Sequence, residues 1–226
     1  MLSRADRILV LSSRAERLYR QAGLSLNTVQ IIENFVNSSG FTPDSPLGKS
    51  WVYIGRLTEE KGIMRLLEHW PPDRSLVVYG DGPLRSSVMK STCENVTYGG
   101  QVAREDIPQI LAASSGLVFS SLWAEGAVPL TYIESLAAGR PVVAISGNAA
   151  ADDILVSETG AVFDDWDQLP MALTRVDADA KNFSRRARER YDAGYGAGNW
   201  VERISEIYRD VIRERGCSDS LPIDAT

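Results

Sequence analysis

Six short apolar runs, separated by helix-length segments, constrain the fold of this chain more than any other feature. Each run is rich in Val, Ile, Leu, Tyr and Phe, and the runs cover residues 51–54, 75–79, 95–98, 116–119, 141–145 and 160–163. A strand that is apolar along its whole length is buried on both faces, as in a parallel sheet covered by helices. The alternation predicts an α/β fold with a Rossmann-like, doubly wound parallel sheet, in which ligands bind beyond the carboxyl ends of the strands.

The composition is that of an ordinary globular protein, with 226 residues of which 44% are hydrophobic and 24% are charged. No apolar run approaches the roughly 20 residues of a transmembrane helix, and the N-terminus has no secretory signal pattern. We therefore expect a cytoplasmic protein. The net charge of −6 argues against a nucleic-acid surface. Residues 185–190 are locally basic, and they are either a solvated helix face or a surface for a membrane or an anionic acceptor.

Several classes of catalytic site are excluded by residue counts. His69 is the single histidine, so a Ser-His-Asp triad, a Cys-His pair or a multi-histidine metal site would depend on that residue alone. Because His69 ends an amphipathic helix pattern over 63–70, we expect it to be a surface or capping residue. The two cysteines, Cys93 and Cys217, have no metal-ligand spacing and give no disulfide framework.

Residues 120–144 combine groups that suit a phosphorylated ligand rich in hydroxyls. Glu125 opens a loop of small residues, and a helix pattern follows over 130–138 with Glu134 inside it. A glycine-containing loop at a helix N-terminus offers free N–H groups to an anion. An ionised carboxylate can accept two hydrogen bonds from a vicinal diol. Together these features predict a site for a nucleotide sugar.

The same residues closely resemble the signature of the retaining glycosyltransferases of family 4 (group 1), which have the two-Rossmann-domain GT-B fold. Three further stretches resemble family motifs in the family's order: 55–62 (GRLTEEKG), 76–83 (LVVYGDGP) and 96–102 (VTYGGQV). The resemblance runs from about residue 5 to about residue 210. It implies that the predicted sheet is one half of a GT-B fold, the half that binds the donor.

Catalytic and binding roles follow from this resemblance. Arg56 and Lys61 would neutralise the leaving nucleoside diphosphate, Glu125 would contact the donor sugar, and Glu134 would accept hydrogen bonds from the ribose hydroxyls. Arg56, Lys61 and Glu125 are thus the catalytic candidates. The other donor-binding candidates are Gly55, Gly80, Val102, Gly126, Ala127 and Leu130. Retaining transfer in this fold uses no metal, so we expect neither a metal site nor a cofactor.

Two features complicate these roles. Eight residues lie between Glu125 and Glu134, whereas the family has seven, so the loop 126–129 must bulge or Glu125 must be displaced. The extra residue also changes the expected aim of the Gly126 and Ala127 amides. Arg56 and Lys61, for their part, have an alternative interpretation as surface ion pairs with the neighbouring glutamates 59 and 60.

The resemblance divides the chain into four parts. Residues 1–36 resemble the last strand and helix of the family's N-terminal domain and the hinge that follows. Residues 37–178 resemble the donor-binding domain, 179–215 the C-terminal helices with a glycine-rich break after 192, and 216–226 a tail. Ile8–Leu11 reads as an apolar strand without a sheet of its own, which would seek another edge. The chain is then a fragment, half of a split enzyme, or a domain in which this segment has repacked.

The leading interpretation is the donor half of a retaining glycosyltransferase of polysaccharide or glycolipid biosynthesis. Its acceptor would be bound by a missing N-terminal domain or a partner subunit, and a peripheral position at the inner face of a membrane stays open. The alternative is a non-catalytic module that binds a nucleotide sugar or docks a partner. A third interpretation is a non-hydrolysing nucleotide-sugar epimerase, which shares the fold.

Overall fold

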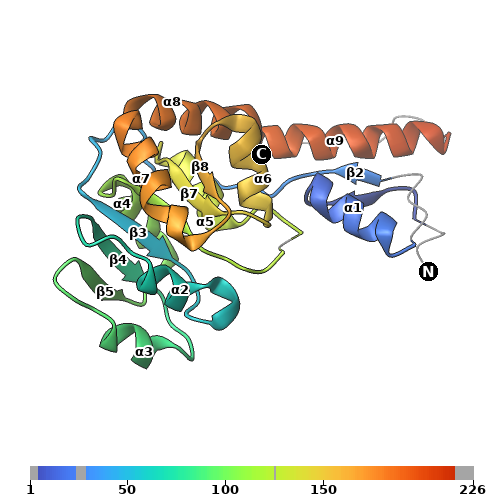
Figure 1. Cartoon of the computed structure of the whole chain (residues 1–226). Coiled ribbons are helices and arrows are strands. Elements are labelled where there is room, and N and C mark those ends of the chain that lie inside the picture. Colours follow the sequence, from blue (N-terminus) through green and yellow to red (C-terminus); the bar gives the residue numbers. More distant parts are fainter. Residues whose placement is uncertain (1–4, 24–28, 125, 217–226) are drawn as a thin grey trace.

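The structure is a computed structural model, and it describes residues 5–23, 29–124 and 126–216. Glu125, a candidate for the sugar contact, and Cys217 lie outside the described residues. The strands are β1 (Ile8–Val10), β2 (Val29–Ile31), β3 (Ser50–Ile54), β4 (Ser75–Tyr79), β5 (Val96–Gly100), β6 (Gly116–Phe119), β7 (Val142–Ile145) and β8 (Gly160–Phe163). The α-helices are α1 (Ser13–Gln21), α2 (Ile63–Glu68), α3 (Arg85–Lys90), α4 (Ile107–Ala112), α5 (Leu130–Ala137), α6 (Ala149–Ser157), α7 (Leu169–Ala178), α8 (Ala180–Arg190) and α9 (Ala197–Glu214) (Figure 1).

Six parallel strands form the central sheet in the order β5-β4-β3-β6-β7-β8. The chain builds outward from β3 through β4 to β5 and then crosses back to place β6 on the other side of β3. Val52 of β3 accordingly pairs with Val77 of β4 and with Leu117 of β6. This is the doubly wound order, and its switch point lies between β3 and β6, where open α/β sheets bind their ligands. The predicted fold class is confirmed.

Side chains alternate between two buried layers, one on each face of the sheet. Trp51 and Tyr53 belong to the layer covered by α2, α3 and α7, whereas Val52 and Ile54 belong to the layer covered by α4, α5 and α6. Helix α5 is buried from Tyr132 to its end. Because both faces of the strands are covered, the strands are apolar throughout rather than alternating.

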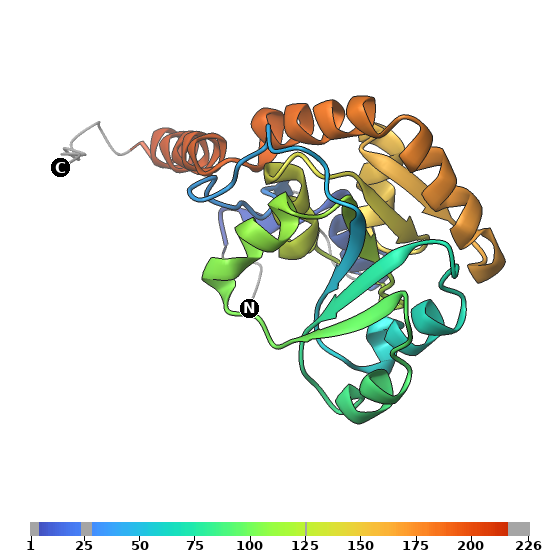
Figure 2. The ribbon, with the colours of Figure 1, turned by 90° about the vertical axis from the view of Figure 1, so that its left-hand side faces the viewer.

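A second, smaller unit projects from this body, and we call it the side lobe. It consists of β1, α1, β2 and α9, with α9 running along β2 and away from the body (Figures 1 and 2). Strand β1 pairs in parallel with β2, with Leu9 opposite Gln30. The expectation of a strand without a sheet is therefore wrong, because the nearby β2 supplies one edge. Several apolar side chains of the lobe stay exposed: Leu9, Leu11, Leu18, Tyr19, Val201 and Tyr208.

A π-helical turn at Tyr191–Tyr195 separates α8 from α9. Gly196 then adopts an extended conformation and caps α9. The predicted break therefore lies at Gly196, and Gly198 is already inside α9. The turn is buried against the segment that enters the sheet, because the Tyr191 hydroxyl donates to the Val36 carbonyl at 2.6 Å.

A mostly buried cluster of charged and phenolic groups joins the body to the side lobe. Arg190 donates two hydrogen bonds to Asp153, at 2.7 and 3.1 Å, and its Nη2 lies 3.4 Å from Glu33, just after β2. The hydroxyl of Tyr132 donates to Asp153 at 2.6 Å. Burial and the charge of Asp153 raise the pKa of Tyr132 well above its ordinary value. Burial lowers the pKa of Arg190, but the hydrogen bonds and charge of Asp153 reverse this shift and raise it overall.

Arg190→Ala should lower the free energy of unfolding by up to about 3–5 kcal/mol, because the mostly buried Asp153 would lose its cation. Thermal and denaturant unfolding measure the change. The matched control is Arg185→Ala on the same helix, since Arg185 is exposed and pairs with Glu189; this change should cost less than about 1 kcal/mol. Equal stability of the two variants would contradict a structural role for the cluster.

Candidate functional site

Three loops meet at the carboxyl edge of the sheet, where β3, β4 and β6 end. Residues 55–62 run between the other two loops: the Leu57 N–H donates to the Asp81 carbonyl at 2.9 Å, and the Ser120 hydroxyl donates to the Lys61 carbonyl at 2.8 Å. The loops after three separate strands thus form one rim, as the sequence predicts.

Glycine is required at two points of this rim. A Cβ on Gly80 would lie 1.8 Å from the carbonyl oxygen of Gly55. Gly62 has a φ of +66°, and a Cβ there would lie 2.2 Å from the carbonyl oxygen of Ser120. Any other residue would clash with backbone, and at Gly62 it would also adopt a left-handed conformation. The glycines of the first two motifs are therefore what lets these loops cross so closely.

Arg56 and Lys61 lie on the first of these loops. The Arg56 side chain is 72% exposed, and its guanidinium is 3.7 Å from the Glu60 carboxylate. Lys61 is half-buried and ends a 3-10 turn (Glu59–Lys61) that leads into α2. The alternative interpretation of Arg56, a surface ion pair with Glu60, is therefore present in the structure. An exposed pair at this distance contributes at most about 1 kcal/mol to stability. An anionic ligand can therefore compete with Glu60 for the Arg56 guanidinium.

The loop 126–129 leads from this rim into α5. Gly126 and Ala127 are half-buried, and Val128 is buried. Helix α5 begins after Pro129 without a side-chain cap, and Leu130 at its start is 41% exposed. The first N–H groups of α5 are thus free of capping side chains, which is the condition for an anion to approach a helix N-terminus.

Glu134 lines a cavity of about 530 Å³ at the second turn of α5. The other walls come from residues within 36–41 and 104–109. Glu134 is 5% exposed, and among the described residues no side chain or backbone group donates a hydrogen bond to its carboxylate. Burial raises its pKa, and the charge of Arg104 opposes this shift. A buried carboxylate without a donor is costly unless a ligand supplies hydroxyl or N–H groups.

The remaining candidates lie around this arrangement. Val102 is half-buried and packs against the apolar core. The N–H of Gly80 donates to the Gly100 carbonyl at 2.9 Å, and its own carbonyl accepts from Tyr98 at 2.9 Å. Gly80 can therefore offer a ligand close approach but not its N–H. Arg104, in the wall of the Glu134 cavity, was not predicted, because no local sequence pattern marks it.

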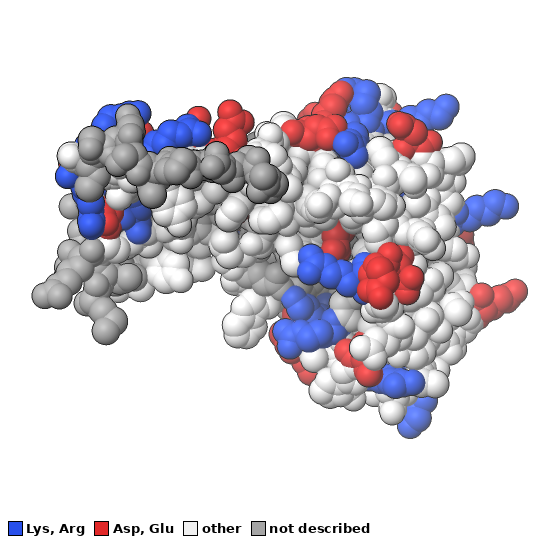
Figure 3. Space-filling view, turned by 180° about the vertical axis from the view of Figure 1, so that it is seen from behind, with Lys and Arg blue, Asp and Glu red and all other residues white. Residues whose placement is uncertain are grey.

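Lys and Arg side chains gather on the body beside the hollow that separates it from the side lobe (Figure 3).

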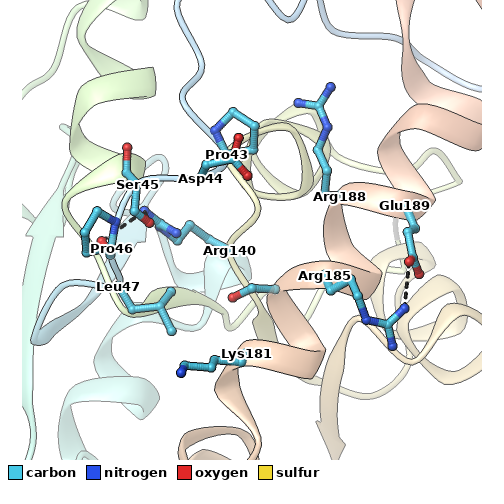
Figure 4. A pocket seen from close by; sticks show the side chains of 11 residues that line it. Pro43, Asp44, Ser45, Pro46, Leu47, Arg140, Lys181, Arg185, Arg188 and Glu189 are labelled. Atoms are coloured by element: carbon cyan, nitrogen blue, oxygen red, sulfur yellow. Dashed lines mark hydrogen bonds and ion pairs between the residues drawn. The ribbon is translucent and has the colours of Figure 1, made fainter.

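A second cavity, of about 550 Å³, lies at the opposite edge of the sheet from the rim, where the strands begin (Figure 4). Its buried Arg140 donates to the last carbonyls of α4, Leu111 at 3.0 Å and Ala112 at 2.5 Å. Arg185 is paired there with Glu189 at 2.6 Å. These cations are already used inside the protein, so we assign no ligand to this cavity.

Other features of the sequence occupy ordinary structural positions. His69 is the C-cap of α2, with its Nδ1 3.0 Å from the Arg65 carbonyl, which confirms the capping role. Cys93 is exposed and free. Over the part of the chain that the structure describes, no group of three or more His, Cys, Asp or Glu residues could hold a metal ion. Across the same residues, none of the helices has both the length and the apolar character needed to cross a bilayer.

The family described as glycosyl transferases group 1 matches residues 48–179 of the chain. Among curated proteins, the UDP-Gal:alpha-D-GlcNAc-diphosphoundecaprenol alpha-1,3-galactosyltransferase of Escherichia coli is 27% identical over 215 residues. That alignment covers 81% of this chain and 54% of the relative. The chain thus spans about half the length of this curated relative.

Solved structures share the fold. Sucrose-phosphate synthase from Thermosynechococcus elongatus superposes with a TM-score of 0.78 at 23% identity, covering 94% of this chain and 60% of that protein. The Anabaena protein HepE, in complex with UDP and glucose, gives a TM-score of 0.77 at 18% identity, covering 91% of this chain and 64% of that protein. Both likenesses support a Rossmann-like domain of the GT-B type.

Gly62→Ala should destabilise the protein by more than the roughly 1–2 kcal/mol that a left-handed conformation costs an L-residue, because the new Cβ would also clash with the Ser120 carbonyl. Denaturant unfolding measures the loss. Gly198→Ala is the matched control: nothing lies within 4 Å of its Cβ position in α9, so stability should hold or rise slightly. A Gly62 variant as stable as wild type would show that the two loops can separate without cost.

Proposed function

The chain belongs to the group 1 glycosyl transferases, and we propose that it binds the nucleoside-diphosphate sugar donor of a retaining glycosyl transfer. The observation that carries this proposal is the buried carboxylate of Glu134. It faces the cavity and accepts no hydrogen bond from the described residues. Two ribose hydroxyls would satisfy it. The nucleoside would then lie between the walls 36–41 and 104–109, and the diphosphate would extend toward the rim.

Arg56 and Lys61 would act on the diphosphate. In the transfer, the bond from the anomeric carbon to the diphosphate oxygen breaks, and its electron pair stays on the leaving diphosphate. A new bond forms from an acceptor hydroxyl, whose proton the departing diphosphate can accept. Negative charge grows on the diphosphate in this step, and two cations stabilise it there more than in the ground state. The donor sugar would be held by Glu125 and by the amide of Gly126.

Replacing either cation should weaken nucleoside-diphosphate binding. A hydrogen bond to a charged group contributes roughly 1.5–3 kcal/mol, so Arg56→Ala and Lys61→Ala should each reduce affinity about ten- to a hundredfold in calorimetric titration with a panel of nucleoside diphosphates. Arg65→Ala is the control, because this exposed cation lies on α2 and pairs with Glu68. Unchanged affinity in both rim variants would remove the rim from the proposal.

The same titrations test metal dependence. Cationic side chains take the position that a metal ion would occupy on the diphosphate, so affinity should be unchanged in excess EDTA. A strict requirement for magnesium or manganese would contradict the assignment of Arg56 and Lys61.

We propose that the acceptor is held outside this chain, by an N-terminal domain or a partner subunit. The support is that the chain spans about half of the E. coli relative. Orientation of two reactants can account for roughly 7–11 kcal/mol of a barrier. A donor half alone lacks this contribution. The side lobe, with Leu9 44% exposed on β1, is the surface that we propose for the other half.

Purified residues 1–226 should accordingly bind donor but transfer sugar negligibly, and should regain transfer with the missing half in cis or as a separate subunit. Leu9→Asp should block that assembly and leave donor binding intact, because it charges an apolar contact surface. Leu155→Asp is the control, since Leu155 is exposed on α6, outside the lobe. Multiple-turnover transfer by residues 1–226 without a second protein would overturn the half-enzyme proposal, and donor binding with no transfer in any assembly would favour a binding module.

A further inference from the structure

The loop before α5 is held by two side chains that do not belong to the body. The Ser12 hydroxyl, at the start of α1, donates to the Gly126 carbonyl at 2.5 Å. The Asn34 amide, three residues after β2, donates to the Val128 carbonyl at 3.1 Å. These partners are 114 and 94 residues apart in sequence. The side lobe and the segment that leaves it therefore fix both ends of a loop to which we have assigned donor contacts.

The hydrogen bond from Ser12 determines which way one amide points. The described residues contain no cis peptide bond, and in a trans peptide the carbonyl and the following N–H point in opposite directions. Since the Gly126 carbonyl faces Ser12, the Ala127 N–H faces away from the side lobe. Among the described residues, no acceptor takes this N–H. The hydrogen bond from Asn34 to the Val128 carbonyl orients no such donor, because the next residue is Pro129, which has no N–H.

The hydroxyl of Ser12 has no freedom to turn elsewhere. Ser12 is 7% exposed, and its oxygen also accepts the Ala15 N–H at 3.0 Å as the N-cap of α1. With its oxygen used by the helix, the single hydroxyl proton is directed at the Gly126 carbonyl. Gly126 itself packs against Ala15, since a Cβ on Gly126 would lie 3.5 Å from the Cβ of Ala15. Loop and helix are thus in contact at this point.

We propose that Ser12 is a positioning residue that aims the Ala127 N–H at the distal phosphate of the donor. The inference rests on the proposed function, which places the nucleoside at Glu134 and the diphosphate toward Arg56 and Lys61. The loop runs from that rim to α5, so Ala127 lies between the cations and the ribose carboxylate. An N–H that bonds a phosphate oxygen is charge-assisted and is strong where it is aimed in advance. Ser12 acts through Ala127 and touches no substrate itself.

Replacing Ser12 by Asp or by Asn, two residues that are isosteric with each other, separates this role from helix capping. Asp and Asn cap helices about equally well, but only the Asn amide can donate to the Gly126 carbonyl. Calorimetric titration with UDP and UMP, or with the diphosphate and monophosphate of whichever base binds wild type, gives the readout. Ser12→Asp should weaken diphosphate binding about tenfold or more and change monophosphate binding less than about twofold. Ser12→Asn should retain both affinities to within about threefold.

The outcomes distinguish a failure of the Ser12 positioning role from a failure of the proposed donor binding. Equal diphosphate affinity in Ser12→Asp and Ser12→Asn overturns the positioning role while leaving the donor site intact. A parallel loss of diphosphate and monophosphate affinity, together with a lowered melting temperature, shows a merely structural role and also overturns it. Wild-type protein that binds no nucleotide overturns the proposed function, and the inference with it. If Ser12→Asp does not fold, Ser12→Ala replaces it in the same comparison with Ser12→Asn.

Discussion

The mostly buried ion pair of Arg190 and Asp153 is the interaction on which the arrangement of this molecule depends. A single guanidinium satisfies Asp153 on α6 and approaches Glu33 just after β2, while the hydroxyl of Tyr132 on α5 donates to the same Asp153 carboxylate. Arg203 of α9 lies 3.3 Å from Glu33 as well. Taking such charges out of water is expensive unless every partner is in place. The cluster therefore selects one relative position for helices α5, α6 and α8, the segment after β2, and α9.

That position carries the site. Helix α5 bears Glu134 and starts at the loop 126–129, so fixing α5 fixes both the ribose carboxylate and the amides ahead of it. The side lobe, held by the same cluster, brings Ser12 and Asn34 against that loop. On the other side, Gly62 and Gly80 allow close backbone contacts, and these hold the loop that carries Arg56 and Lys61 against the ends of β4 and β6. The donor site that we propose is thus assembled from two sides, by buried charge on one and by close backbone packing on the other.

Much of this could be predicted from the sequence, and the failures have identifiable causes. The strands were found because parallel strands buried on both faces are apolar throughout. The pairing of β1 with β2 was missed because strands of three residues carry too little pattern to show a partner. Arg104 was missed because no local pattern says that residues after β5 will face a carboxylate on α5.

The sequence by itself determined the fold class, the doubly wound sheet and the rim on which Arg56 and Lys61 lie, because these follow from local hydrophobic pattern, glycine placement and the rule that parallel strands end together. Tertiary structure alone decided which groups meet across long stretches of chain: Ser12 with Gly126, Arg190 with Asp153 and Glu33, and the cavity around Glu134. The reason is physical. Burial and hydrogen bonding between residues far apart in the sequence depend on the packing of whole helices, and no short segment of sequence encodes that packing.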